Sequence, residues 1–235
     1  MSFEHAVMLL AWGALVGLDL VSMPQAMIAR PLVAGAVGGA MLGDLQMGLQ
    51  LGVIFELFQY DILPMGAVRY PEYGPATVAA VAAAHAAAGA LALAETERQL
   101  GAVGLGVVVG LVTGLLGGIS IHLMRRINDW AVRRHTDALE RGDVSVVVRL
   151  HVMSILRDAV RAALVTVVGL ALAAAVGDLL VRGLPVRSAM VVAVLTTGAA
   201  VAAATVGILR LVGRGSNLRW FAAGLLSGAI GAWLR

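Results

Sequence analysis

The chain has 235 residues, of which 60% are hydrophobic and only 13% are charged, and its mean hydropathy is +0.91. Soluble domains usually have about 45–50% apolar and about 25% charged residues, so this composition indicates an integral membrane protein. The net charge of +3 comes from 17 basic residues that are all arginine. They lie mostly beside apolar segments, where they set membrane topology and do not indicate nucleic-acid binding. The absence of cysteine excludes disulfides and thiolate catalysis.

The first apolar segment covers residues 5–22, close to the length of about 20 residues that a membrane span requires. Asp19 and Ser22 mark its end. Residues 1–20 contain neither a basic n-region nor a small-residue cleavage site. We therefore expect this segment to be a permanent span and not a removed signal peptide.

The next apolar stretch, residues 32–58, is broken at Gly43 and Asp44. Each half is too short to cross a bilayer, and short apolar segments interrupted by glycine indicate re-entrant hairpins that line a cavity. Arg30 precedes Pro31, and a residue before proline is disfavoured within a helix, so a helix is expected to start there. Asp44 is expected to cap the helix that follows it.

Two spans rich in small residues follow, at residues 75–95 and 100–123. Small residues let helices approach closely, so the alanine-rich first span is expected to pack against protein more than against lipid. In the second span Gly106, Gly110 and Gly114 recur on one helical face, which predicts a close helix contact.

Residues 124–157 differ from the rest of the chain because seven arginines and four acidic residues lie within them. Ile127, Trp130 and Ala131 follow helical spacing, so part of this segment is predicted to be an amphipathic interfacial helix. The excess of arginine predicts that the segment is a cytoplasmic loop.

Three further apolar segments, residues 158–181, 187–209 and 218–234, complete the chain. The sequence thus predicts one membrane domain over residues 1–235, an all-α polytopic helical bundle with broken or re-entrant hairpin segments. We find no soluble domain and no internal repeat. The five histidines lack the spacing of a metal site, so no metal is expected.

Charged residues stand out within the apolar stretch from residue 30 to residue 72. An ionisable side chain at the centre of a membrane helix costs roughly 2.5–3.5 kcal/mol on insertion scales, so such residues are candidates for a substrate pathway. They are Arg30, Asp44, Glu56, Asp61, Arg69 and Glu72.

The same stretch contains an ordered set of short motifs, and a second block follows later in the chain. The motifs are Arg30-Pro31-Leu32, Leu42-Gly43-Asp44, Glu56, Gly66-Ala67 and Pro71-Glu72, with Leu150-His151-Val152-Met153-Ser154 as the second block. Together they resemble the membrane-channel IIC component of the mannose/fructose/sorbose-type sugar phosphotransferase system. The resemblance covers essentially the full length and is sharpest over residues 19–80.

This resemblance implies a sugar-translocating subunit of the inner membrane that forms an oligomer with a second membrane protein, IID. In that family soluble IIA and IIB proteins relay phosphate to a hexose-type sugar, which lies at the IIC–IID interface, and part of each subunit moves like an elevator. No catalytic residue and no cofactor are expected on this chain itself.

Glu56 is the first candidate for sugar binding, because a carboxylate accepts strong charge-assisted hydrogen bonds from sugar hydroxyls. The alternative is a structural ion pair with Arg30 or Arg69. Gln25 matches a polar position of the family, and its amide both donates and accepts. Gln25 either contacts the ligand or bonds to backbone of the broken helix.

Further residues are weaker candidates for the sugar site. Asp61 either contacts the ligand, marks a helix end or pairs with Arg69. Glu72, like Asp44, either caps a helix or contacts the ligand. Arg30 is favoured as an anchor or ion-pair partner. His151 is a candidate for the cytoplasmic face, where it would contact IIB or the phosphorylated sugar.

Two rival interpretations remain open. Ile62-Leu63-Pro64 stands where common family members carry a Trp-x-Asn segment, which favours a membrane anchor or sensor that no longer transports sugar. An intramembrane enzyme built on Ser227 and His85 is a remote second alternative.

Overall fold

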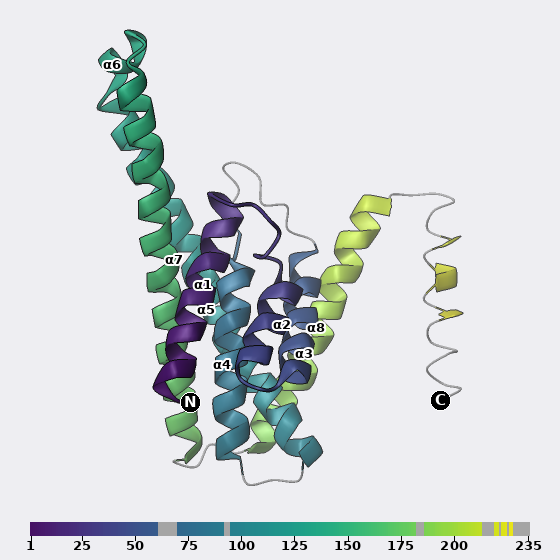
Figure 1. The fold of residues 1–235 in the computed structure, drawn as a ribbon. Coiled ribbons are helices and arrows are strands. Elements are labelled where there is room, and N and C mark those ends of the chain that lie inside the picture. Colours follow the sequence, from purple (N-terminus) through teal and green to yellow (C-terminus); the bar gives the residue numbers. More distant parts are fainter. Residues whose placement is uncertain are drawn as a thin grey trace.

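The computed structural model describes residues 1–60, 70–91, 95–181 and 186–212, and short helical pieces between 219 and 227. The described chain is a bundle of helices, shown in Figure 1. The helices are α1 (Phe3–Val21), α2 (Pro31–Met41), α3 (Leu45–Gln59), α4 (Tyr73–Ala90), α5 (Glu95–Arg133), α6 (Thr136–Glu140), α7 (Val144–Val181) and α8 (Val186–Val212).

Four of the described helices, α1, α5, α7 and α8, are long and apolar enough to cross a membrane. Their outer faces carry large exposed apolar side chains, such as Leu115, Val160 and Val194. A water-soluble bundle would not expose so much apolar surface, whereas lipid tails solvate it. The all-α polytopic membrane fold expected from composition is confirmed.

Helices α2 and α3 form the predicted hairpin, and neither crosses the bundle alone (Figure 1). Pro31 occupies the first turn of α2, and Gly43 turns the chain with a φ of +75°, a conformation that glycine adopts without strain. The Asp44 carboxylate accepts a hydrogen bond from the Met47 amide at 2.9 Å and caps α3, as predicted. A Cβ on Gly39 would lie 2.8 Å from the Gly48 Cα, so only glycine allows this backbone contact.

Helix α4 lies in the centre of the bundle and contacts α1, α2, α3, α5 and α7. Its residues from Tyr73 to Ala84 are all buried, which confirms that the alanine-rich segment packs against protein. The glycine ladder of α5 makes the predicted close contact with it. A Cβ on Gly106 would lie 2.7 Å from the Ala80 carbonyl oxygen, and one on Gly114 would lie 3.3 Å from the Ala76 Cβ.

The segment 124–157, expected to be a cytoplasmic loop with an amphipathic helix in part of it, is mostly helical. Helix α5 continues to Arg133 and α7 begins at Val144, and the short α6 joins them, so the two long helices form an arm that extends beyond the bundle (Figure 1). Arginine has a high helix propensity, and exposed pairs such as Arg133–Asp129, four residues apart, add only a few tenths of a kcal/mol each. Hydropathy marks where the apolar run ends, but not where the helix ends.

Candidate functional site

Polar side chains gather at the end of the bundle where α1 and α3 end and α2 and α4 begin. This end lies on the side from which the arm extends (Figure 1). Three features occupy it: the base of the α2–α3 hairpin, a buried ion cluster, and a pocket against α5. The predicted site residues are divided among these features.

The base of the hairpin is closed by Glu56 and Arg30. The Arg30 guanidinium donates to Oε1 of Glu56, and the Leu32 amide in the first turn of α2 donates to Oε2 at 3.2 Å. The Arg30 side chain is 47% exposed and that of Glu56 is 15% exposed. The ion pair weighed as an alternative for Glu56 is therefore present. Each carboxylate oxygen has a second lone pair, so Glu56 keeps acceptor capacity for a ligand.

Gln25 lies in the irregular connection between α1 and α2. The buried Asp19 carboxylate holds this connection by accepting from the amides of Ala26 at 2.6 Å and Ala29 at 3.0 Å. Gln25 adopts a φ of +59° and is exposed. Its amide has no hydrogen-bond partner among the residues that the structure places, so it is accessible to a ligand.

Glu72 belongs to a buried ion cluster instead of an open surface. Both of its carboxylate oxygens accept from the Arg161 guanidinium, at 2.6 and 2.9 Å, and the side chain is fully buried. Asp158 accepts from Nε of Arg161 at 2.7 Å and from the Ser22 hydroxyl at 2.5 Å. Glu72 occupies the N-cap position of α4, but its carboxylate pairs with Arg161 and makes no capping hydrogen bond there.

Sequence reasoning missed Arg161 and Asp158. The available signal was their spacing of three residues inside an otherwise apolar span, because intramembrane charges need partners. Arg161 also donates to the Gly17 carbonyl oxygen at 3.1 Å and to the Ser120 hydroxyl at 3.2 Å. One side chain therefore joins α1, α5 and α7 to the start of α4.

The remaining predicted residues lie elsewhere. His151 is exposed on α7 within the arm, away from the base of the hairpin. Asp61 and Arg69 fall in residues 61–69, outside the residues that the structure describes. Among the described residues no cluster of His, Cys, Asp and Glu has the arrangement of a metal site.

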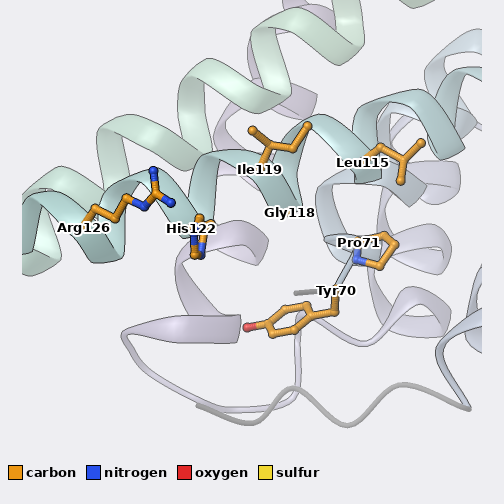
Figure 2. A pocket seen from close by; sticks show the side chains of 7 residues that line it. All are labelled: Tyr70, Pro71, Leu115, Gly118, Ile119, His122 and Arg126. Carbon is orange, nitrogen blue, oxygen red and sulfur yellow. The ribbon is translucent and has the colours of Figure 1, made fainter. Parts of the chain in front are cut away.

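A pocket of about 360 Å³ lies between α5 and the segment that leads into α4 (Figure 2). Its wall is apolar at one end and polar at the other, where Tyr70, His122 and Arg126 line it. The Tyr70 hydroxyl accepts from Arg125 at 3.1 Å. The lining residues are Tyr70, Pro71, Leu115, Gly118, Ile119, His122 and Arg126.

The fold and the charged base of the hairpin define a polytopic membrane protein with a re-entrant polar element. Residues 3–228 match the family model described as the sorbose-specific IIC component of the phosphotransferase system, and the chain belongs to this family of sugar-transport membrane proteins.

Two solved structures resemble the chain. One, described as a structure of a membrane protein, has a TM-score of 0.72 and 18% identity over 97% of this chain and 87% of that chain, and so shares the fold. The other, a cryo-EM structure of the mannose transporter ManYZ in complex with a microcin, has a TM-score of 0.48 and 16% identity over the same shares. No match was found among the curated proteins.

Proposed function

We propose that this chain is the sugar-translocating IIC subunit of a mannose-type phosphotransferase system. It works with a IID membrane subunit and with soluble IIA and IIB phosphocarriers. Family membership supports the class, and the accessible Glu56–Arg30 pair at the base of a re-entrant hairpin is the observation that carries the proposal. Charges at the base of such a hairpin are typical of a translocation pathway.

The base of the hairpin has the chemistry that a sugar requires. A sugar must exchange its bound water for several donors and acceptors within a small volume. Glu56 offers acceptors, Arg30 offers guanidinium donors, and the exposed Gln25 amide offers both. Hydrogen bonds to charged groups are about twice as strong as neutral ones, so the Glu56–Arg30 pair would supply most of the affinity.

The hairpin is also the element best suited to move. Its two helices contact each other through glycine backbone, as at Gly39 and Gly48, so the hairpin forms a compact unit. We propose that this unit alternates access to the sugar from the two sides of the membrane. Phosphorylation by IIB then traps the product inside, with Asp61, Arg69 and the IID subunit completing the site.

The arm indicates which side faces the cytoplasm. Arginines concentrate along it, and the positive-inside rule places such segments in the cytoplasm. His151 is exposed there, so the arm offers a surface on which IIB would dock.

The test is Glu56→Gln, with Glu4→Gln as the matched control on an exposed first turn. Sugar uptake and phosphorylation are measured in vesicles that contain all four components, with mannose, fructose and sorbose. Each hydrogen bond lost from a charged group costs about 1.5–3 kcal/mol, or about 10- to 150-fold in affinity. We expect Glu56→Gln to lose sugar binding while IID still co-purifies, and Glu4→Gln to behave as wild type.

Two results would contradict the proposal. Wild-type sugar affinity in Glu56→Gln would remove this residue from the site. An intact complex that carries none of the three sugars would favour the anchor or sensor alternative.

A further inference from the structure

The pocket against α5 is separate from the base of the hairpin, and its residues have no part in the proposed sugar contacts. Its volume of about 360 Å³ falls within the range of roughly 300–1,000 Å³ that small-molecule sites occupy. In Figure 2 His122 and Arg126 project from α5 one turn apart, the Tyr70 hydroxyl points toward that side from the connecting segment, and Pro71 lies near Leu115 at the other end. Polar groups from two elements therefore meet at one end of the pocket.

The polar end carries excess positive charge. Arg126 is exposed and has neither an ion pair nor a hydrogen bond within the described parts of the chain. Arg125 lies beside it, with its guanidinium 5.7 Å from the centre of the Tyr70 ring. Of the carboxylates that the structure describes nearby, Asp129 pairs with Arg133 and Glu72 pairs with Arg161. A ligand that complements this end is an anion.

The pocket is held in shape by backbone contacts. The Glu72 amide donates to the Gly114 carbonyl oxygen at 2.8 Å, which ties the connecting segment to α5. Gly118 lies against the Tyr70 carbonyl group, so a side chain there would displace Tyr70. The connecting segment that carries Tyr70 is thus fixed against α5 before any ligand arrives.

We propose that this pocket binds a phosphoryl group, with a phosphorylated sugar as its favoured source. Arginine matches the geometry of phosphate oxygens with paired donors, and the His122 ring and the Tyr70 hydroxyl add further donors. The apolar wall of Leu115, Ile119 and Pro71 offers van der Waals contact to one face of the ligand, while sugar hydroxyls stay toward the polar end and water. This inference rests on the proposed function, which makes a sugar phosphate the product released on the side of the arm.

An anionic lipid headgroup presents the same chemistry. Leu115 and Ile119 are 57% and 67% exposed on the outer face of α5, so an acyl chain has access to the same wall. An experiment can distinguish the two sources. In a bilayer of neutral lipid no anionic lipid is present, so only a sugar phosphate added to the water can bind.

The test uses the purified full chain in nanodiscs of neutral phosphatidylcholine, with mannose 6-phosphate and inorganic phosphate titrated by calorimetry. Arg126→Gln is the main variant, and Arg134→Gln is the matched control. Arg134 directly follows α5, and its guanidinium lies 4.8 Å from the centre of the Trp130 ring. Loss of charged hydrogen bonds predicts that Arg126→Gln weakens phosphate binding about 10- to 100-fold. Arg134→Gln should bind as wild type, and Arg126→Lys should keep part of the affinity.

A second arm repeats the measurement with nanodiscs that contain phosphatidylglycerol and counts retained lipid by native mass spectrometry. Retention of that lipid by wild type but not by Arg126→Gln supports the phosphoryl site with the lipid as its source. Equal behaviour of Arg126→Gln and Arg134→Gln in both arms overturns the proposal.

Parallel titration with unphosphorylated mannose separates this inference from the proposed function. If mannose binds but Arg126→Gln does not change phosphate binding, the phosphoryl site is refuted and the proposed sugar site is unaffected. Phosphate binding that depends on Arg126, in a protein that binds no sugar, refutes the proposed transport and leaves the pocket. Glu4→Gln, a change on the exposed first turn of α1, should leave phosphate binding unchanged.

Discussion

Replacing Arg161 with glutamine should destabilise the bundle more than any exposed charge change. The guanidinium donates to Glu72, Asp158, Ser120 and the Gly17 carbonyl oxygen, and both carboxylates are fully buried. Removing one partner of a buried ion pair costs about 3–5 kcal/mol, because the other charge is left without compensation. For a chain of 150–250 residues, 1 kcal/mol shifts Tm by about 2–4 °C, so we expect a fall of roughly 6–20 °C.

The assay is thermal unfolding in detergent followed by intrinsic tryptophan fluorescence, which the four tryptophans of the chain permit. Arg133→Gln is the matched control, because its ion pair with Asp129 is exposed and screened by solvent. That control should unfold as wild type. An Arg161→Gln protein with an unchanged Tm would refute the view that this cluster holds the helices together.

A double variant tests the pairing itself. Glu72→Gln alone leaves Arg161 paired with Asp158, so it should lower Tm less than Arg161→Gln does. Combining the two removes one of the uncompensated carboxylates, and residues in one ion network couple by about 0.5–3 kcal/mol. The double variant should therefore be more stable than Arg161→Gln alone, and additive losses would contradict a direct pair.

Two further predictions concern local structure. Gly39→Leu should separate α2 from α3, since its side chain would meet the backbone of Gly48, and limited proteolysis of the hairpin should report it against wild type. Outside the membrane spans, the hydrogen bond from the Ser145 hydroxyl, followed by that from the Val146 amide, lowers the pKa of Asp143. Because the folded state favours the ionised carboxylate, Asp143 stabilises the start of α7 above its unfolded pKa of about 4. This stabilisation is lost as the pH falls through the pKa of Asp143 in the folded state. Hydrogen exchange at the first turn of α7, corrected for intrinsic rates, should therefore rise below that pH in wild type but not in Asp143→Asn.

The hairpin could be predicted from sequence because its signals are local. Arg30-Pro31 starts α2, Gly43 turns the chain, and Asp44 caps α3, each through contacts within a few residues. The pairing of Glu56 with Arg30 was among the expected alternatives, because both stand out as charges in an apolar stretch.

The ion cluster and the arm could not be predicted in the same way. Arg161 reaches Glu72 across 89 positions of sequence, and no spacing rule connects them. Hydropathy predicts a loop because it falls where α5 leaves the apolar span. Helix propensity is a separate property, and the seven arginines of residues 124–157 favour helix.

The two ion pairs at this end of the bundle differ in a way that bears on transport. The Glu72–Arg161 pair is buried, joins α1, α4, α5 and α7, and would cost several kcal/mol to separate. The Glu56–Arg30 pair is partly exposed, joins only the two helices of the hairpin, and falls in the class worth about 0–1 kcal/mol. A ligand that replaces the contacts of the second pair needs little energy to open it, whereas no ligand contact compensates for breaking the first. The four helices joined by Arg161 therefore form a fixed frame, and under the proposed function we expect alternation of access to occur at the hairpin.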